Sequence, residues 1–266
     1  MAGNSVVLKA RDVTKVYPPD IWALDKVSLD IEEGKFVTMI GPSGCGKTTF
    51  LKIAAGIEGY QEGEVLFGGE KVFMDYDWRR SVIYQDIRLF PWMTARENIY
   101  FALQNKGLSR SEAERIGNEW MRVIGVDAFA EKYPGEVSEG QKQMVGVARV
   151  LALDPTLVLC DEPFSSLDWS TRSCLQIEIS KYWYEKKRTI LFVTHDIEEA
   201  VYLSQEVICM SVRPGKVKEV VKIDLPEKRW EVARNDPKLL EYASRVANIL
   251  ADELRKGKEL EKKVGY

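Results

Sequence analysis

The sequence lacks a hydrophobic run long enough to cross a membrane. A spanning helix needs roughly 18 or more apolar residues, and the best candidate, residues 145–160, is interrupted by Arg149, Asp154 and Pro155. The N-terminus also lacks the basic and then apolar pattern of a secretion signal. We therefore expect an intracellular protein without a membrane-spanning segment of its own.

Cysteine is scarce and follows no pattern. The 4 cysteines form no C-x-x-C pair. The sequence therefore favours reduced thiols in the cytosol over disulfides or a cysteine metal site. We expect all of them to be buried filler of the core. They are Cys45, Cys160, Cys174 and Cys209.

An excess of positive charge is also missing. Lysine and arginine number 38 against 41 aspartates and glutamates, which gives a formal net charge of −3. This balance argues against a nucleic-acid partner, which would need a basic face. With 45% hydrophobic and 30% charged residues among 266, the chain has the composition of a soluble globular protein. Its length fits one large domain or two tightly joined lobes.

The most informative feature present is a glycine-rich segment directly after the apolar run 36–40. It follows the pattern G-x-x-x-x-G-K-[ST], which binds phosphates when it lies between a strand and a helix. Its glycines let backbone N–H groups point at phosphate oxygens, and the helix N-terminus adds a positive dipole. Lys47 supplies a cation for the outer phosphates, and the Thr48 hydroxyl can bind Mg²⁺. The segment consists of Gly41, Pro42, Ser43, Gly44, Cys45, Gly46, Lys47, Thr48 and Thr49.

Strands and helices alternate along most of the chain. Short apolar runs predict strands, and glycine, proline and capping residues mark the ends of elements. The expected strands span residues 6–13, 26–31, 35–40, 80–85, 156–160, 189–194 and 206–212, with a hairpin at 64–72 and a last strand that ends at 225. Helices are expected over residues 46–56, 169–187 and 196–204. Buried strands separated by helices imply an α/β fold with a parallel sheet covered on both faces.

A mainly helical lobe is expected over residues 87–152. Capping boxes start at Thr94, Ser109 and Ser138, and such boxes open helices. The predicted helices span residues 96–105, 110–124 and 138–153, and Gly125 closes the second of them.

We predict a single domain with three parts. They are a nucleotide-binding core (1–86 and 153–225), the helical lobe (87–152) with the Ser138 motif, and a charged helical tail (226–266). Within the tail, residues 253–263 are expected to form a solvated surface helix because charged residues dominate them.

Further motifs indicate a family. Val-Ser-Glu-Gly-Gln at 137–141 resembles the signature motif of ABC ATPases, and Leu-Val-Leu-Cys-Asp-Glu at 157–162 resembles their Walker B strand with its catalytic glutamate. Ser-Ser-Leu-Asp at 165–168 resembles the D-loop. The motifs follow the family's order and spacing over nearly the whole chain. The residues that match are Tyr17 (adenine stacking), Gln85 (Q-loop), Ser138, Glu139, Gly140 and Gln141 (signature), Asp161 and Glu162 (Walker B), Ser166 and Asp168 (D-loop) and His195 (switch histidine).

The resemblance implies the fold and the chemistry together. It implies a P-loop NTPase of ABC type, with an N-terminal antiparallel β part, a mainly parallel sheet and a helical lobe. Such a protein binds and hydrolyses ATP with Mg²⁺, which Thr48, Gln85 and Asp161 would help to hold. Catalysis would fall to Glu162, His195 and Gln85.

The residue types support the roles of the acidic pair and of the histidine. Asp161 ends an apolar strand at the carboxyl edge of the sheet, where ligands bind in open α/β folds, and its carboxylate can hold Mg²⁺. Glu162 follows it and can polarise the attacking water. His195 ends the strand 190–194 at the same edge, and its neutral ring can donate to a γ-phosphate. The alternatives are a solvated acidic loop and a structural histidine.

The signature motif predicts that one chain is insufficient. Ser138 and Gln141 form a capping box, so the helix behind them presents free N–H groups and a positive end, which suit a phosphate. The resemblance implies that this end faces ATP held by a second subunit. Two ATP molecules would then join a twofold dimer, which hydrolysis would let open.

Three features keep alternatives open. Gln85 can be a catalytic Q-loop residue or a solvated loop residue. The apolar stretch 89–94 can plug the core, or line a groove that receives a short helix of a membrane subunit, as the resemblance implies. An aromatic ring for adenine can come from Tyr17 or from nearby Trp22, and we favour Tyr17.

Two residues depart from the family pattern. Glu139 replaces the usual glycine of the signature, and Met144 stands where arginine is common. At an effective dielectric of ~20, two unit charges ~8 Å apart repel by roughly 2 kcal/mol. Glu139 can therefore weaken the closed dimer if it points at the γ-phosphate, whereas solvent would screen it otherwise.

We expect the ATP-hydrolysing subunit of an ABC importer, placed peripherally on the cytoplasmic face of the inner membrane. Several segments, such as Phe-Pro-Trp at 90–92 and Arg-Pro-Gly-Lys at 213–216, resemble ATPases of the nitrate, sulfonate and taurine importers. The implied partners are a second nucleotide-binding subunit, a polytopic permease and, indirectly, a substrate-binding protein. The alternatives are a nucleotide-responsive partner of a different ATPase and a soluble ABC ATPase outside transport.

Overall fold

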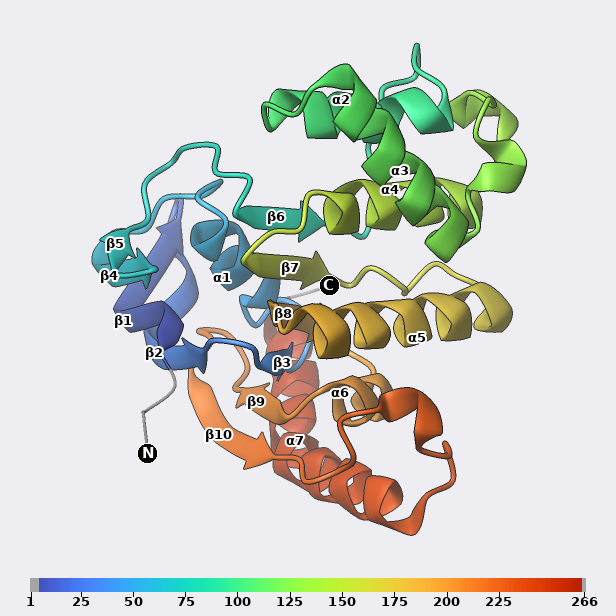
Figure 1. The fold of residues 1–266 in the computed structure, drawn as a ribbon. Coiled ribbons are helices and arrows are strands. Elements are labelled where there is room, and N and C mark those ends of the chain that lie inside the picture. The colour runs from blue at the N-terminus through green and yellow to red at the C-terminus, as the bar shows by residue number, and fades with distance from the viewer. Residues whose placement is uncertain (1–4, 265–266) are drawn as a thin grey trace.

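The described residues form two β-sheets, of which the one with β1, β2, β4 and β5 lies at the left edge in Figure 1. The structure is a computed structural model that describes residues 5–264, without the side chains of Leu254 and residues 256–264. The first sheet is antiparallel, with the strand order β2-β1-β4-β5. Its strands are β1 (Val6–Tyr17), β2 (Ile21–Glu32), β4 (Glu62–Phe67) and β5 (Glu70–Lys71). The hairpin prediction is confirmed, but β1 and β2 are longer than predicted because both continue to the turn at residues 18–20.

The second sheet confirms the predicted parallel core. Its order is β10-β9-β3-β8-β7-β6, and all neighbours are parallel except the edge strand β10. Every residue of β3, β7 and β8 is buried, as expected for a parallel sheet that is covered on both faces. The strands are β3 (Phe36–Ile40), β6 (Arg80–Ile83), β7 (Leu157–Asp161), β8 (Thr189–Thr194), β9 (Glu206–Met210) and β10 (Val217–Lys222).

The two faces of this sheet belong to two hydrophobic cores. Alternate side chains of a strand point to opposite faces, so Leu159 of β7 joins the core with Phe50 of α1 (Lys47–Ala54) and the antiparallel sheet. Cys160 joins the other core with Leu175 of α5 (Trp169–Lys186). Helix α6 (Ile197–Leu203) also contributes to this second core. The layers fix the carboxyl ends of β3, β7 and β8 at one edge.

The helical lobe consists of α2 (Ala95–Asn105), α3 (Arg110–Ile124) and α4 (Glu139–Ala152), which pack on one another beyond β6 and β7 (Figure 1). All three predicted capping boxes are present. Gly125 ends α3 with a φ of 81°, a left-handed conformation in which glycine pays no steric penalty. Short 3-10 turns at Asp127–Phe129 and Pro134–Glu136 connect α3 to α4.

The C-terminal part corrects the prediction of a continuous helical tail. Residues 226–236 contain only a short 3-10 turn, η3 (Arg229–Glu231), and α7 begins at Pro237 and extends to Val264. The turn is held by the buried Arg229 side chain, which donates to the carbonyls of Pro226 and Ser204. No helix among residues 5–264 is long and apolar enough to cross a membrane.

The expectation of a solvated helix at 253–263 is wrong at its first residue. Glu253 is only 4% exposed because α7 packs against α6 and β9. Its carboxylate accepts from the backbone N–H of Val212 at 3.0 Å and lies 3.2 Å from the ammonium of Lys218. Arg255 is exposed, and the side chains of residues 256–263 lie outside the described part.

The cysteine prediction is confirmed for three residues and wrong for Cys174. Cys45, Cys160 and Cys209 are buried, whereas Cys174 lies on the exposed side of α5. Burial raises the pKa of the Cys45 thiol above its usual value, so that thiol stays protonated.

Candidate nucleotide-binding and hydrolysis site

The phosphate loop connects β3 to α1, as the sequence predicts. Gly46, at the N-cap of α1, has a φ of 94°, and a Cβ there would lie 2.6 Å from the carbonyl oxygen of Ala23. Only glycine fits this close approach. The loop therefore turns directly over β2 and presents the N-terminus of α1 to the sheet edge.

Lys47 lies inside the loop. It is 5% exposed, and its ammonium donates to the carbonyls of Gly41 at 2.8 Å and Pro42 at 3.1 Å. These bonds satisfy a buried charge that would otherwise be costly. They also hold the cation at the loop where phosphates would bind.

Thr48 and Asp161 meet across the sheet edge. The Thr48 hydroxyl donates to the Asp161 carboxylate at 2.7 Å. Burial raises the pKa of Asp161 above its usual value, although the hydrogen bond from Thr48 opposes this. A hydroxyl and a partly buried carboxylate are hard oxygen ligands of the kind that Mg²⁺ takes, together with water and phosphate. The donor set therefore fits the expected Mg²⁺.

Glu162 and His195 form a pair at the same edge. The ring Nδ1 of His195 lies 2.9 Å from Oε2 of Glu162, although the two residues end different strands. Glu162 has a φ of 45°, which is uncommon outside glycine, and its N–H donates to the Val193 carbonyl at 2.9 Å. Backbone strain of this kind persists where the surroundings enforce it, often at functional sites. Here it aims the carboxylate into the cavity in front of the phosphate loop.

That cavity has a volume of about 210 Å³. Tyr17 lines it and Trp22 does not, which favours Tyr17 for the adenine ring. Arg213 also lines it, and sequence reasoning missed this residue because its turn was read only as a family feature. The lining residues are Tyr17, Ile21, Ala23, Ser43, Gly44, Gly46, Lys47, Thr48, Thr49, Glu162 and Arg213.

Neither Gln85 nor the D-loop residues Ser166 and Asp168 line this cavity. Gln85 is exposed and follows β6, whose neighbour β7 ends in Asp161. Ser166 is exposed. Asp168 caps α5, accepting from the N–H groups of Ser170 at 2.9 Å and Thr171 at 3.1 Å. The Asp168 carboxylate therefore has a structural use besides its predicted role.

The signature residues lie apart from the cavity, at the N-terminus of α4. Ser138 accepts from the N–H of Gln141 at 3.2 Å, and Gln141 accepts from the N–H of Ser138 at 2.9 Å. The Glu139 side chain is 78% exposed and lies 2.6 Å from the Lys142 ammonium. This pairing and exposure correspond to the screened alternative for Glu139. Gly140 completes the exposed helix start, and none of the four lines the cavity described above.

A second, larger cavity of about 980 Å³ lies between the helical lobe and the sheets. Phe90 lines it, and the Phe90 ring packs 5.6 Å from that of Trp92, which is 68% exposed. The stretch 89–94 is thus partly an exposed groove wall rather than only a core plug. The wall opposite it includes Ile57, Met74 and Tyr76.

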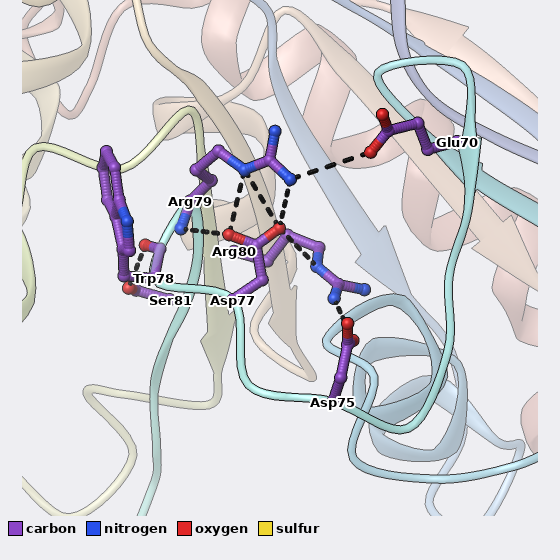
Figure 2. Close-up of polar contacts among 7 residues, drawn as sticks. All are labelled: Glu70, Asp75, Asp77, Trp78, Arg79, Arg80 and Ser81. Atoms are coloured by element: carbon purple, nitrogen blue, oxygen red, sulfur yellow. Dashed lines mark hydrogen bonds and ion pairs between the residues drawn. The ribbon is translucent and has the colours of Figure 1, made fainter. Parts of the chain in front are cut away.

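The charged residues Asp75, Asp77 and Arg80 also line this groove, and Figure 2 shows their contacts. The Arg80 side chain is only 3% exposed, and its guanidinium reaches the carboxylates of Asp75 at 2.7 Å and Asp77 at 3.6 Å. Arg79 binds the same Asp77 at 2.8 Å and extends to Glu70 at 3.9 Å (Figure 2). The loop 73–79 is therefore held in place by ion pairs.

A family model described as ABC transporter matches residues 24–165. The chain belongs to the ABC transporter ATP-binding family. It is an ATPase of this type, with the phosphate loop, acidic pair and signature helix of the family on the family's fold. The predicted fold class is confirmed.

Two relatives and one solved structure show how far the likeness extends. The chain is 42% identical to an uncharacterised ABC transporter ATP-binding protein, MJ0412, of Methanocaldococcus jannaschii over 254 residues, 94% of each chain. It is 44% identical to the aliphatic sulfonates import ATP-binding protein SsuB of Bacillus cereus over 215 residues, which cover 81% of this chain and 84% of the relative. A dimeric post-hydrolysis structure of the ATP-binding cassette MJ0796, bound to ADP and Pi, matches with a TM-score of 0.74 and 32% identity, over 82% of this chain and 100% of that one.

Proposed function

We propose that this ATPase energises an importer for a small anionic nutrient of the nitrate, sulfonate and taurine class. The observation that carries the proposal is the 44% identity to a sulfonate import subunit over 81% of the chain. The fold around the phosphate loop supplies the hydrolysis machinery, and the transported molecule would pass through a separate membrane subunit.

We infer that two copies of the chain close around ATP. The N-terminus of α4 is exposed and lies apart from the chain's own phosphate cavity, which leaves its free N–H groups available to a partner. A related cassette forms a dimer in its post-hydrolysis structure. Closure with ATP and opening after hydrolysis would drive the membrane subunit.

The groove between the lobes is the proposed docking place for that membrane subunit. Tyr76, which is 77% exposed, lines it, and Trp92, which is 68% exposed, packs on the lining residue Phe90. Exposed apolar surfaces of this kind mark protein interaction sites. We propose that a short cytoplasmic helix of a permease docks in this groove, so that the ATPase would lie at the cytoplasmic face of the inner membrane. A binding protein on the other side would deliver the nutrient.

Each catalytic residue has a proposed part in hydrolysis. Mg²⁺, held by Thr48, Asp161 and Gln85, would neutralise phosphate charge when ATP is bound. Lys47 binds the outer phosphates, and Glu162 polarises the attacking water. His195, 2.9 Å from Glu162, orients that carboxylate and donates toward the γ-phosphate.

Co-purification from native membranes in mild detergent tests the assembly. We expect a polytopic membrane protein with no second ATPase species, and its binding-protein partner would identify the nutrient class. The variant Trp92→Asp should lose the membrane protein, whereas Trp22→Asp, also an exposed tryptophan, should keep it. Recovery of a distinct second ATPase would instead support an asymmetric complex, and recovery of soluble partners alone would overturn the transport role.

A further inference from the structure

The turn between β9 and β10 packs directly on the phosphate loop. The N–H of Gly215 donates to the Ala23 carbonyl at 3.0 Å, and the Gly215 carbonyl accepts from the N–H of Asp25 at 3.1 Å. A Cβ on Gly215 would lie 1.9 Å from the Cys45 carbonyl oxygen, so no larger residue fits there. The turn is therefore fixed to both β2 and the phosphate loop.

This turn presents Arg213 to the nucleotide cavity. Its Nε donates to the Gly44 carbonyl at 3.1 Å, and a Cβ built on Gly44 would lie 2.8 Å from one terminal nitrogen. Among the side chains that the structure describes, the guanidinium has no carboxylate partner. Arg213 is exposed and lines the 210 Å³ cavity, so its remaining N–H groups are available to a ligand.

A cation at this position would balance the negative charge of a bound nucleotide. Its lining contains two cationic side chains, Lys47 and Arg213, and one carboxylate, Glu162. A nucleoside triphosphate brings several negative charges, and a guanidinium binds phosphate oxygens with directed, charge-assisted hydrogen bonds. Lys47 lies deep in the loop, whereas Arg213 lies at the exposed rim.

The C-terminal helix holds the residue that precedes Arg213. Glu253 of α7 accepts from the N–H of Val212 at 3.0 Å and pairs with Lys218 at 3.2 Å. A carboxylate that is only 4% exposed would be costly without such partners. The bond to Val212 links α7 to the backbone of the turn.

We propose that Arg213 binds the phosphates of the nucleotide and that Glu253 positions it. The inference rests on nucleotide binding at the phosphate loop, and it gives the tail after residue 226 a role in the nucleotide site. Arg213 is a binding residue, and Glu253 acts only through the turn.

Calorimetric titration of the full chain with Mg-ADP tests the binding role. We expect Arg213→Ala to raise the Kd roughly tenfold, the low end for a charge-assisted hydrogen bond because the residue is exposed. Arg213→Lys should recover part of the affinity. Arg110→Ala removes the same charge on α3, where the side chain is 85% exposed, and should leave the Kd unchanged.

An unchanged Kd for Arg213→Ala, beside a large loss of affinity for Lys47→Ala, would overturn the inference alone. No binding by the wild-type chain would overturn nucleotide binding as well.

A double-mutant cycle tests the positioning role. Glu253→Ala should raise the Kd severalfold in the wild-type background and have no further effect in Arg213→Ala. Asp252→Ala, an exposed neighbour on α7, should change neither value. If Glu253→Ala weakens binding equally in both backgrounds, or not at all, Glu253 does not act through Arg213.

Discussion

The N-termini of α1 and α4 offer the same chemistry in different surroundings. Both present free N–H groups and a positive dipole, which suit phosphate. At α1, residues with proposed roles in hydrolysis lie in contact, with Asp161 at 2.7 Å from Thr48 and Glu162 at 2.9 Å from His195. At α4 the helix start is exposed, and its described polar contacts are local ones, the capping box of Ser138 and Gln141 and the Glu139–Lys142 ion pair.

The two helix ends therefore differ in which of the residues proposed for hydrolysis lie beside them. At the α1 end, strands that are distant in sequence bring the proposed nucleotide-binding and catalytic residues to one sheet edge. None of residues 138–141 at the α4 end lines the cavity in front of the phosphate loop. We therefore expect substitutions at the N-terminus of α1 to have an effect in a single chain. Substitutions at the N-terminus of α4 should have an effect only when two chains form a dimer.

The largest effect is expected at Glu162. Glu162→Gln keeps the shape but removes the base, so ATP turnover should fall at least about hundredfold, while Mg-ADP affinity stays within about twofold. Phosphate release measures turnover. Glu64→Gln, an exposed glutamate on β4, serves as the control and should retain full activity. Turnover above a tenth of the wild-type value in Glu162→Gln would contradict the assignment.

The substitution His195→Ala should cause the next largest loss of ATP turnover. Loss of the ring removes the group that lies 2.9 Å from the Glu162 carboxylate, so turnover should fall roughly ten- to hundredfold. Nucleotide binding should remain largely intact, because the cavity lining does not include this residue. Unchanged turnover would refute the catalytic role.

The substitution Ser138→Ala distinguishes the role of the α4 N-terminus from that of the α1 N-terminus. It removes the cap of α4 at a cost of about 1 kcal/mol in stability, and turnover should fall about tenfold because the partner's phosphate loses its receptor. The monomer's affinity for Mg-ADP should not change. Ser109→Ala removes the same kind of capping box from α3 and should lower stability equally without loss of turnover. A matching loss of activity in both variants would mean that stability alone explains the effect.

The smallest effect is expected at Glu139. Glu139→Gly should tighten ATP-driven dimerisation, but by less than about fivefold, because exposure and the Lys142 ion pair screen the charge. Sedimentation of chains that also carry Glu162→Gln measures the dimer in ATP. Glu139→Gln separates charge from helix propensity and should act in the same direction. Weaker dimerisation in both would contradict the repulsion.

The sequence predicted what depends on local pattern. The phosphate loop, the acidic pair and the three capping boxes need only neighbouring residues, and the structure has each of them at the expected place. The end of α3 at Gly125 was likewise predictable from the local chemistry of a glycine cap.

What the sequence could not predict depends on contacts between distant segments. The left-handed backbone of Glu162 is held by Val193 on the next strand. Glu253 looks like a surface residue until α7 brings it to Val212 and Lys218. Arg213 gains its place because Gly215 lies against Cys45. The exposure of Cys174 similarly depends on which side of α5 the sheet covers.

We propose that each hydrolysis site combines α1 of one chain with α4 of another. Mixing two inactive variants, Lys47→Ala and Ser138→Arg, tests it most directly. In a mixed dimer, one site would pair an intact phosphate loop with an intact signature helix. We expect the mixture to regain ATP turnover that neither variant has alone. A mixture as inactive as its components, although the two chains form mixed dimers in ATP, would contradict it.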